Sequence, residues 1–296
     1  MSNMTTTAKI SQRKIKKKKR INRSLGGDIA LMIVLVLFGF FSAYPLVMTA
    51  SNAFKSLDEM FVFPPTLIPR NPTFDNFRDL GDLVSGSQIT FSRYFFNTIL
   101  ITVLGTAGHV IIASMCAFPL AKYKFPGSKL IFSIIVYSLM FAPQVTATAN
   151  YIIISGIGLM DSIWAIILPA IASSLGLYLM KQFMEQIPME LIESAKIDGA
   201  SEYRIFFQIV MPLVKPAWLT LVILLFQRLW ASTGGIFIYS EEWKPLSYAL
   251  QQIAQGSIER QGTIAAVSFV LMIVPVVFFI FSQSRIVETF SHSGMK

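Results

Sequence analysis

Charged residues are scarce in this chain of 296 residues, because Asp, Glu, Lys and Arg together make up only 14% of it. A soluble domain usually carries about a quarter charged residues. Hydrophobic residues account for 54% of the chain, and its mean hydropathy is +0.60. The composition therefore excludes an ordinary water-soluble domain and favours a protein that lies in a lipid bilayer.

Residue types that build metal sites and catalytic centres are also rare. Cys116 is the one cysteine, so no internal disulfide can form, and there are two histidines. His109 falls inside an apolar stretch and His292 lies near the end of the chain, and neither has a cysteine or carboxylate at metal-ligand spacing. We expect no metal ligand, no cofactor-binding residue and no catalytic residue, and we interpret His109 as a packed, hydrogen-bonded side chain.

Long apolar stretches fill most of the remaining sequence. A helix that spans a bilayer needs roughly 20 apolar residues. Five charge-free stretches of about this length are present, at 29–50, 95–119, 130–149, 162–180 and 263–282. A sixth, at 216–235, is interrupted only by Arg228. Backbone amides find no partner in lipid, and the alternating segments of a barrel are not seen, so the sequence predicts an all-α membrane protein with about six transmembrane helices.

The net charge of +9 is concentrated at the start of the chain. Residues 1–24 contain nine Lys and Arg and no acidic residue, whereas the remainder is balanced. A basic run directly before a spanning helix is typical of a topology signal that binds anionic lipid headgroups. Nucleic-acid binding would require interleaved aromatic residues, which this run lacks. The following apolar run is too long for a cleaved signal peptide, so we predict a basic cytoplasmic tail at 1–28 and a transmembrane domain at 29–296.

Sorting Lys and Arg by the side of each loop predicts the orientation. The segments that we place inside contain 18 of the 25 basic residues, and those that we place outside contain 7. Both termini are then cytoplasmic by the positive-inside rule. The outside loops are expected at about 51–94 and 234–262, and the largest inside segment at about 181–215.

This inside segment has the pattern of two short helices joined at a glycine. Pro188 suits the first turn of a helix, and Asp198 and Gly199 are expected to end it, because glycine adopts a left-handed cap without a steric clash. Ser201 can cap a second helix. The residues expected on the apolar faces are Leu191, Ile192, Ala195, Tyr203, Phe206, Phe207 and Val210.

The same segment resembles the EAA loop of bacterial ABC importer permeases. The matching residues are Glu193, Ser194, Ala195, Lys196, Ile197, Asp198, Gly199 and Ala200, followed by Ile209, Met211 and Pro212. The sequence departs from the family pattern at Ser194, where the family has Ala, and at Met211, where it has Leu. Weaker matches cover most of the chain after about Asp28. In its wider context the segment is similar to the carbohydrate-uptake branch, which includes the maltose-transporter permeases.

The resemblance implies a type I ABC importer permease fold and a role in sugar or oligosaccharide uptake across the bacterial cytoplasmic membrane. The implied partners are a second homologous permease, two ATP-binding-cassette ATPase subunits and an extracytoplasmic solute-binding protein. ATP and Mg would be bound by the ATPases, so this subunit would be no enzyme by itself. The residues implied to couple to the ATPase are Glu193, Ser194, Ala195, Asp198, Gly199, Ala200 and Pro212. The alternative is that 181–215 is an ordinary amphipathic connector.

Polar residues near the outer ends of two predicted spans are candidates for a substrate path. Polar groups are costly in lipid, and sugars present hydroxyls to amides and ring faces to aromatic side chains. The candidates are Gln144, Asn150, Tyr151, Gln227 and Trp230. Each could instead make an interhelical hydrogen bond, and Gly105 and Gly108 are interpreted as sites of close helix packing.

Two other classes of function fit the sequence less well. A secondary transporter would need buried carboxylates or charge pairs within its spans, and the clear spans contain none. A membrane-embedded enzyme would need a nucleophile with an acid and a base, and the carboxylates near the membrane surface, Asp161, Glu190 and Glu193, form no such constellation. The sequence does not identify the sugar.

Overall fold

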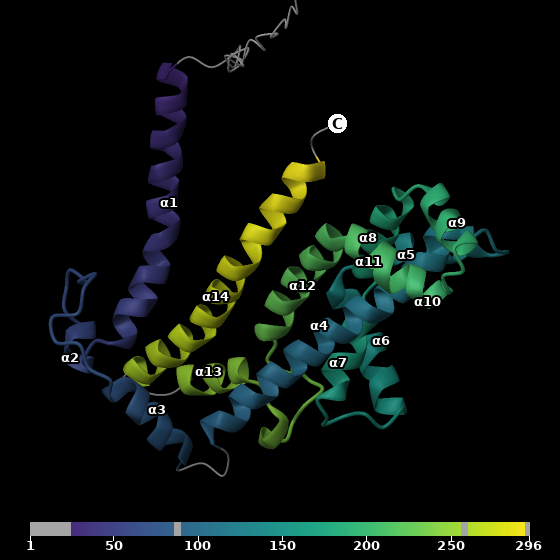
Figure 1. Cartoon of the computed structure of the whole chain (residues 1–296). Coiled ribbons are helices and arrows are strands. Elements are labelled where there is room, and N and C mark those ends of the chain that lie inside the picture. Colours follow the sequence, from purple (N-terminus) through teal and green to yellow (C-terminus); the bar gives the residue numbers. More distant parts are fainter. Residues whose placement is uncertain (1–24, 86–89, 256–259, 294–296) are drawn as a thin grey trace, which may run out of the picture. The chain divides into compact units, whose positions relative to one another are not determined.

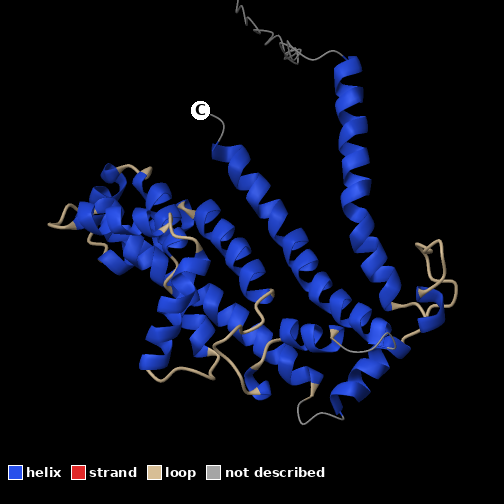
Figure 2. Cartoon of the chain, turned by 180° about the vertical axis from the view of Figure 1, so that it is seen from behind, coloured by secondary structure: helices blue, strands red, loops and turns tan. Residues whose placement is uncertain are grey.

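The computed structural model describes residues 25–85, 90–255 and 260–293, and these form helices joined by turns without any strand (Figures 1 and 2). The chain divides into two compact units, Met1–Leu46 and Val47–Lys296. The first unit contributes the start of helix α1 (Leu25–Ala53), whose described side chains there are exposed. Most of the predicted basic tail, up to residue 24, lies outside the described residues.

The second unit contains the end of α1 and every later element. The loops predicted to lie outside contain α2 (Leu57–Met60), α3 (Asp75–Ser85), the 3₁₀ turn η2 (Glu241–Trp243) and α13 (Leu246–Ala254). The long helices are α4 (Phe91–Lys122), α12 (Lys215–Trp230) and α14 (Gln261–Ser293). Between them lie α5 (Ser128–Ser138), α6 (Pro143–Gly156), α7 (Trp164–Ile171), α8 (Ser174–Glu185), α9 (Met189–Ile197), α10 (Glu202–Arg204), the π-helical segment η1 (Ile205–Val210) and α11 (Met211–Leu213).

The helices match the apolar stretches predicted from the sequence. Among the described residues, four helices are long and apolar enough to cross a membrane, and a fifth results if the bent pair Glu202–Leu213 and Lys215–Trp230 is one span. The remaining predicted stretch, 130–149, is divided between α5 and α6, with Pro143 at the start of α6. The expected number of about six is therefore roughly matched, with one span interrupted.

Helix α4 is the central element of the second unit and packs against α7, α8 and α12 (Figure 1). Its buried face is unusually polar and small, with Asn97, Thr98, Thr102, Thr106, His109 and Ser114 all buried. Its exposed face is apolar and includes Val103, Ile111 and Ile112. This reversal of the usual soluble pattern suits a helix whose outer face meets lipid, because small residues permit close helix contact and polar groups can bond across helices.

Two glycines of α4 confirm the interpretation of close packing. A Cβ atom at Gly105 would lie 2.5 Å from Leu229 Cδ1 of α12, and one at Gly108 would lie 2.7 Å from Ile171 Cδ1 of α7. Both distances are shorter than any normal carbon contact. The Leu229 and Ile171 side chains therefore pack directly on the α4 backbone and would have to shift for any larger residue at these two positions.

His109 is packed and hydrogen-bonded, as predicted. Its ring is 2% exposed and its Nδ1 lies 2.8 Å from the backbone oxygen of Ile171. A carbonyl only accepts, so the ring must carry a proton on Nδ1. The helix is interrupted between α7 and α8 at Ala172 and Ser173, and the His109 ring bonds the carbonyl of the last residue of α7, Ile171. A Cβ atom at Gly176 would lie 1.8 Å from His109 Nε2, so this glycine makes room for the ring.

Trp230 likewise bonds a backbone carbonyl that lacks a helical partner, in this case beside a proline in α14. Pro275 lacks an amide hydrogen, so the carbonyl of Leu271, four residues earlier, has no helical partner. The Trp230 indole Nε1 donates to this carbonyl at 2.9 Å, and its ring stacks on Phe226. Trp230 is only 3% exposed. The buried indole joins α12 to α14, and the place of Trp230 in a substrate path stays a prediction.

We predict that Trp230→Phe will destabilise the fold, although this substitution keeps an aromatic ring at position 230. Phenylalanine keeps much of the aromatic contact but leaves the Leu271 carbonyl unsatisfied, at a cost of about 1–3 kcal/mol. Thermal unfolding of the purified protein in detergent should show a lower melting temperature. Trp164→Phe, at an indole that is 45% exposed, is the control, and equal shifts for the two variants would contradict this role.

Candidate functional site

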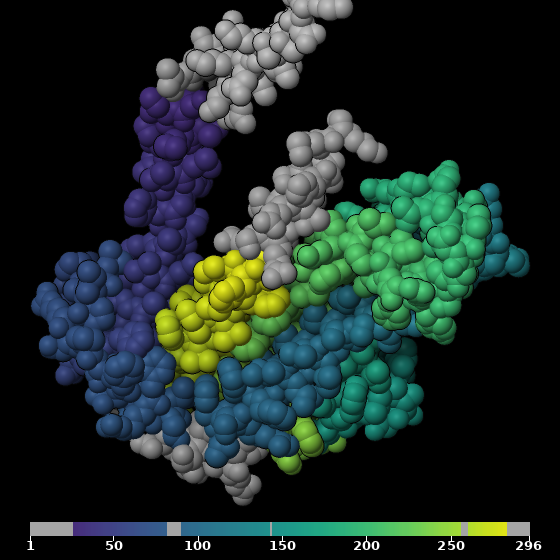
Figure 3. Space-filling model, in the orientation of Figure 1, coloured from purple at the N-terminus to yellow at the C-terminus, as the bar shows by residue number. Residues whose placement is uncertain are grey.

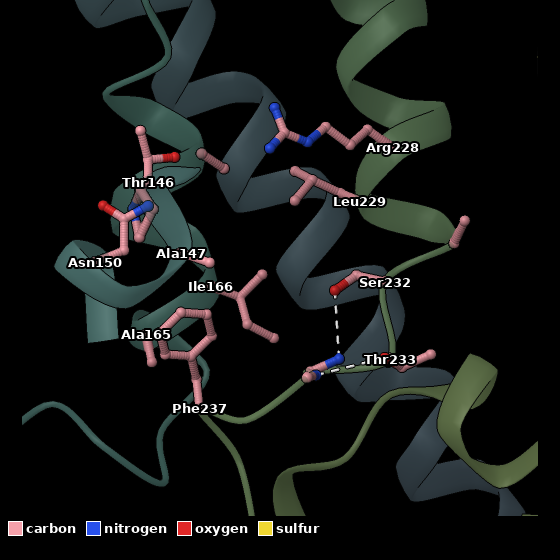
Figure 4. A pocket seen from close by; sticks show the side chains of 15 residues that line it. Thr146, Ala147, Asn150, Ala165, Ile166, Arg228, Leu229, Ser232, Thr233 and Phe237 are labelled. Atoms are coloured by element: carbon pink, nitrogen blue, oxygen red, sulfur yellow. Dashed lines mark hydrogen bonds between the residues drawn. The ribbon is translucent and has the colours of Figure 1, made fainter. Parts of the chain in front are cut away.

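A cavity of 470 Å³ opens between α6, α7, α12 and the turn that follows α12. Its polar side chains are Thr146, Asn150, Arg228, Ser232 and Thr233. Its walls are apolar and include Ile166, Leu229 and Phe237. Figure 4 shows the Arg228 side chain extending from α12 toward the face of α6 that carries Thr146 and Asn150. The volume is within the roughly 300–1,000 Å³ that is usual for ligand sites.

The structure brings only part of the predicted path to this cavity. Asn150 lines it, whereas Gln144, Tyr151 and Gln227 are exposed on the same elements but do not line it. Sequence reasoning missed Ser232 and Thr233. They lie in a polar turn directly after α12, where their hydroxyls accept from the amides of Gly234 and Gly235 at 3.3 and 3.4 Å. The run of Ser, Thr and two glycines after an apolar stretch was the available signal.

Asp161 positions the loop that carries Phe237. The Asp161 amide donates to the Phe237 carbonyl at 2.8 Å. The carboxylate accepts from the amides of Tyr239 and Ser240 at 3.1 and 2.8 Å, and from the Ser240 hydroxyl. Burial alone would raise the pKa of Asp161, but these hydrogen bonds hold it below its usual value. The loop is therefore fixed to the segment between α6 and α7.

The predicted EAA-like segment lies at the C-terminal end of α4. Helix α9 ends at Ile197, and Gly199 has φ +78°. The Gly199 amide bonds the Lys196 carbonyl at 3.0 Å, and the Ala200 amide bonds the Ala195 carbonyl at 3.0 Å. This pair is the Schellman arrangement, in which a left-handed residue satisfies the last carbonyls of a helix. The prediction of a glycine cap at Gly199 is confirmed.

Burial within the segment differs in part from the expected faces. Ile192 and Ala195 are 0% and 9% exposed and belong to a core formed by α4, α8, α9, η1 and α12. Leu191 is 42% exposed and Tyr203 is 72% exposed, so they do not share that core. The small side chain of Ala195 lets α9 pack closely on its own chain. Besides Leu191, exposed residues of α9 and its C-cap include Glu193, Ser194, Ile197 and Asp198.

A cluster of three polar side chains joins this segment to the end of α4. The Tyr123 hydroxyl donates to Glu202 Oε2 at 2.5 Å, and Lys196 Nζ lies 2.6 Å from Glu202 Oε1. Lys196 also donates to the Tyr123 hydroxyl at 3.1 Å. The hydrogen bonds from Lys196 and Tyr123 lower the pKa of Glu202, and the hydrogen bonds of Lys196 with Glu202 and Tyr123 raise the pKa of Lys196. Exposed ion pairs stabilise little, so this cluster mainly sets orientation.

The chain bends sharply where the segment enters α12. The angle between Glu202–Leu213 and Lys215–Trp230 is 77°. Pro212 and Pro216 both lack amide hydrogens, which removes the helical hydrogen bonds that would keep the chain straight. Figure 3 shows the segment, in green, on the surface of the second unit. Pro212 is exposed on it.

The N-terminal end of α4 is also held by contacts with another part of the chain. Asn97 Nδ2 donates to the carbonyls of Glu242 and Lys244 at 2.8 and 3.1 Å. The Arg93 guanidinium lies 3.1 Å from the Glu242 carboxylate and stacks over the Trp243 ring. One helix therefore contacts the outer loop at its start and the EAA-like segment at its end.

Comparison with known proteins identifies the family. Residues 109–290 match the model of the family described as "Binding-protein-dependent transport system inner membrane component". The chain is 31% identical over 234 residues to protein LplC of Bacillus subtilis, covering 76% of this chain and 75% of that protein. It is 33% identical over 191 residues to the galactooligosaccharides transport system permease protein GanQ of Bacillus subtilis, covering 64% of each chain.

A solved structure supports the fold. A chain of a bacterial ABC transporter involved in the import of the acidic polysaccharide alginate superposes with a TM-score of 0.77. The superposition covers 89% of this chain and 98% of that chain, at 20% sequence identity. The family match covers more than half of the residues and includes α6, α7, α12 and the EAA-like segment. This chain therefore belongs to the family of inner membrane components of binding-protein-dependent transport systems.

Proposed function

We propose that this permease subunit carries a sugar or oligosaccharide into the cytoplasm, and that α9 with Gly199 docks on an ATPase subunit. The observation that carries the proposal is the exposed glycine-capped segment fixed to α4. Ile197 at its tip is 87% exposed beside the cap, so it is accessible to a partner. A short helix seated in a groove of a partner can transmit rigid-body motion.

The sugar part of the proposal is supported by the cavity and by the relatives. Hydroxyl and amide groups of Thr146, Asn150, Ser232 and Thr233 suit sugar hydroxyls, and Phe237 suits a ring face. One relative is named as a permease for galactooligosaccharides. The structurally similar chain belongs to a transporter involved in the import of an acidic polysaccharide. These names favour a carbohydrate but leave its charge open. Gln144, Tyr151 and Gln227 remain predictions for the approach to the cavity.

The proposed assembly contains this chain, a second homologous permease, two ATP-binding-cassette ATPase subunits and an extracytoplasmic solute-binding protein. ATP and Mg belong to the ATPases in this proposal. The basic tail at 1–28 is proposed to contact anionic lipid rather than nucleic acid, through charge attraction to the cytoplasmic leaflet. Both termini and α9 are proposed to lie in the cytoplasm, which the distribution of Lys and Arg supports.

The orientation predicts which introduced cysteines an impermeant reagent can reach. In a Cys116→Ser background, Tyr239→Cys should be labelled in sealed cells because Tyr239 is 68% exposed in the outer loop. In protein expressed without the ATPase that is proposed to cover this position, Ile197→Cys should be labelled only after permeabilisation. Labelling of Ile197→Cys in sealed cells would show that α9 lies outside and would contradict the proposed topology.

A matched pair of glycine substitutions tests ATPase docking. Gly199 and Gly127 both have positive φ, +78° and +88°, and a Cβ atom at either would meet nothing within 4 Å. Valine should therefore cost a similar amount at both, about 1–3 kcal/mol of local backbone strain. Only Gly199→Val should lose ATPase recruitment or hydrolysis stimulated by loaded binding protein, because only that side chain would enter the docking surface.

The two variants should be purified with their partners, and the bound ATPase and stimulated hydrolysis measured. Gly127→Val is the control, because it introduces similar backbone strain outside the proposed docking surface. Equal loss of coupling in both would indicate backbone strain alone. Normal coupling in Gly199→Val would make 181–215 a simple connector.

A further inference from the structure

Arg228 is a cation within a membrane helix that no protein group neutralises in the described part of the chain. It lies two residues before the end of α12. No ion pair or hydrogen bond of its side chain is formed with any described residue. Arg93, by contrast, has the Glu242 carboxylate at 3.1 Å and the Trp243 ring beside it. Charged side chains in membrane helices are costly and usually have a partner or a functional role.

The surroundings of Arg228 identify the kind of partner it lacks. It is the one charged residue among the fifteen that line the cavity, and none of the fifteen is Asp or Glu. The other polar lining groups are neutral hydroxyls and one amide. A neutral sugar needs no fixed cation, because hydroxyls and amides satisfy its hydrogen bonds. A guanidinium fork instead matches an anionic group with two parallel hydrogen bonds.

Close packing of α12 fixes the backbone position of Arg228, from which the charged side chain extends. Leu229, the next residue, is 4% exposed and packs against α4, where its Cδ1 fills the space beside Gly105. Leu225 of the same helix is also buried. The backbone of α12 is therefore held against α4, while the Arg228 side chain extends from it toward α6 (Figure 4).

We propose that the transported sugar is anionic and that Arg228 binds its negative group in this cavity. The inference rests on the proposed function, since it names the class of sugar that the same site accepts. A uronate carboxylate and a sugar phosphate share the chemistry that the guanidinium recognises. Thr146, Asn150, Ser232 and Thr233 would contact the hydroxyls of the same ligand.

Uptake by the complete transporter in proteoliposomes tests this assignment. The probes are trisaccharides of galacturonate, mannuronate and guluronate, each with its carboxyl-reduced neutral counterpart, and a hexose phosphate with its free hexose. At least one anionic probe should be taken up with a lower KM than its neutral counterpart. Arg228→Gln should raise that KM about tenfold or more, because it removes a charge-assisted bidentate contact, and should change neutral uptake less than twofold.

Two further variants separate charge from folding. Asn150→Asp adds a negative charge to the same cavity without altering Arg228, so it should weaken uptake of the anionic probe more than uptake of its neutral counterpart. Arg78→Gln removes a cation from outer helix α3, where the side chain is 79% exposed, and should leave all uptake unchanged. Assembly of each variant with its partners is checked by copurification.

The outcomes distinguish this inference from the proposed function. Uptake of neutral counterparts as efficient as that of every anionic probe would overturn the anionic class and leave sugar import standing. Equal losses for anionic and neutral probes in Arg228→Gln would make the residue a structural or interfacial cation. Absence of uptake for every sugar probe by the assembled, ATP-hydrolysing transporter would overturn the proposed function as well.

Discussion

The hydrogen bond between His109 and the Ile171 carbonyl permits the broken helix on which the site depends. In lipid, each unsatisfied backbone group costs several kcal/mol, so a helix can break there only where side chains supply partners. His109 does so at the gap between α7 and α8, and Trp230 does so opposite Pro275 in α14. These bonds satisfy one carbonyl at the end of α7 and one carbonyl beside the proline of α14.

Helix α4 connects these local contacts along its length, from one side of the membrane to the other. Its 32 residues correspond to about 48 Å at 1.5 Å per residue. Asn97 binds the outer loop near the start, His109 binds the helix break in the middle, and Tyr123 binds Glu202 beyond the end. Gly105 lets α12 pack directly beside the cavity. A movement of the EAA-like segment would therefore be transmitted to α4 and, through its packing, to the cavity walls.

Sequence patterns predicted the features that depend on one residue or on a long apolar run. The membrane helices, the close packing at Gly105 and the left-handed cap at Gly199 follow from local chemistry, and the structure confirms them. The break between α5 and α6 was missed because an apolar run of the right length continues through it. Pro143 was the only local signal of that break.

Tertiary context decided the remaining cases. Trp230 is polar at one atom and lies near the outer end of a span, so sequence could not distinguish a path from a bond to the Leu271 carbonyl. Ala195 faces its own core because the adjacent helices supply that core. The cavity joins α6, α7 and α12, which are far apart in the chain, so Ser232 and Thr233 could be assigned to it only after folding.

The central claim is that the segment fixed to α4 is the point of contact with an ATPase. Photocrosslinking from position 197 tests it most directly, because Ile197 is 87% exposed at the tip of α9. A photoreactive residue placed there in the assembled transporter should capture the ATPase subunit in high yield, whereas one at Tyr239 in the outer loop should not. Failure to capture the ATPase from position 197, in a transporter that still copurifies with it and hydrolyses ATP, would contradict the account.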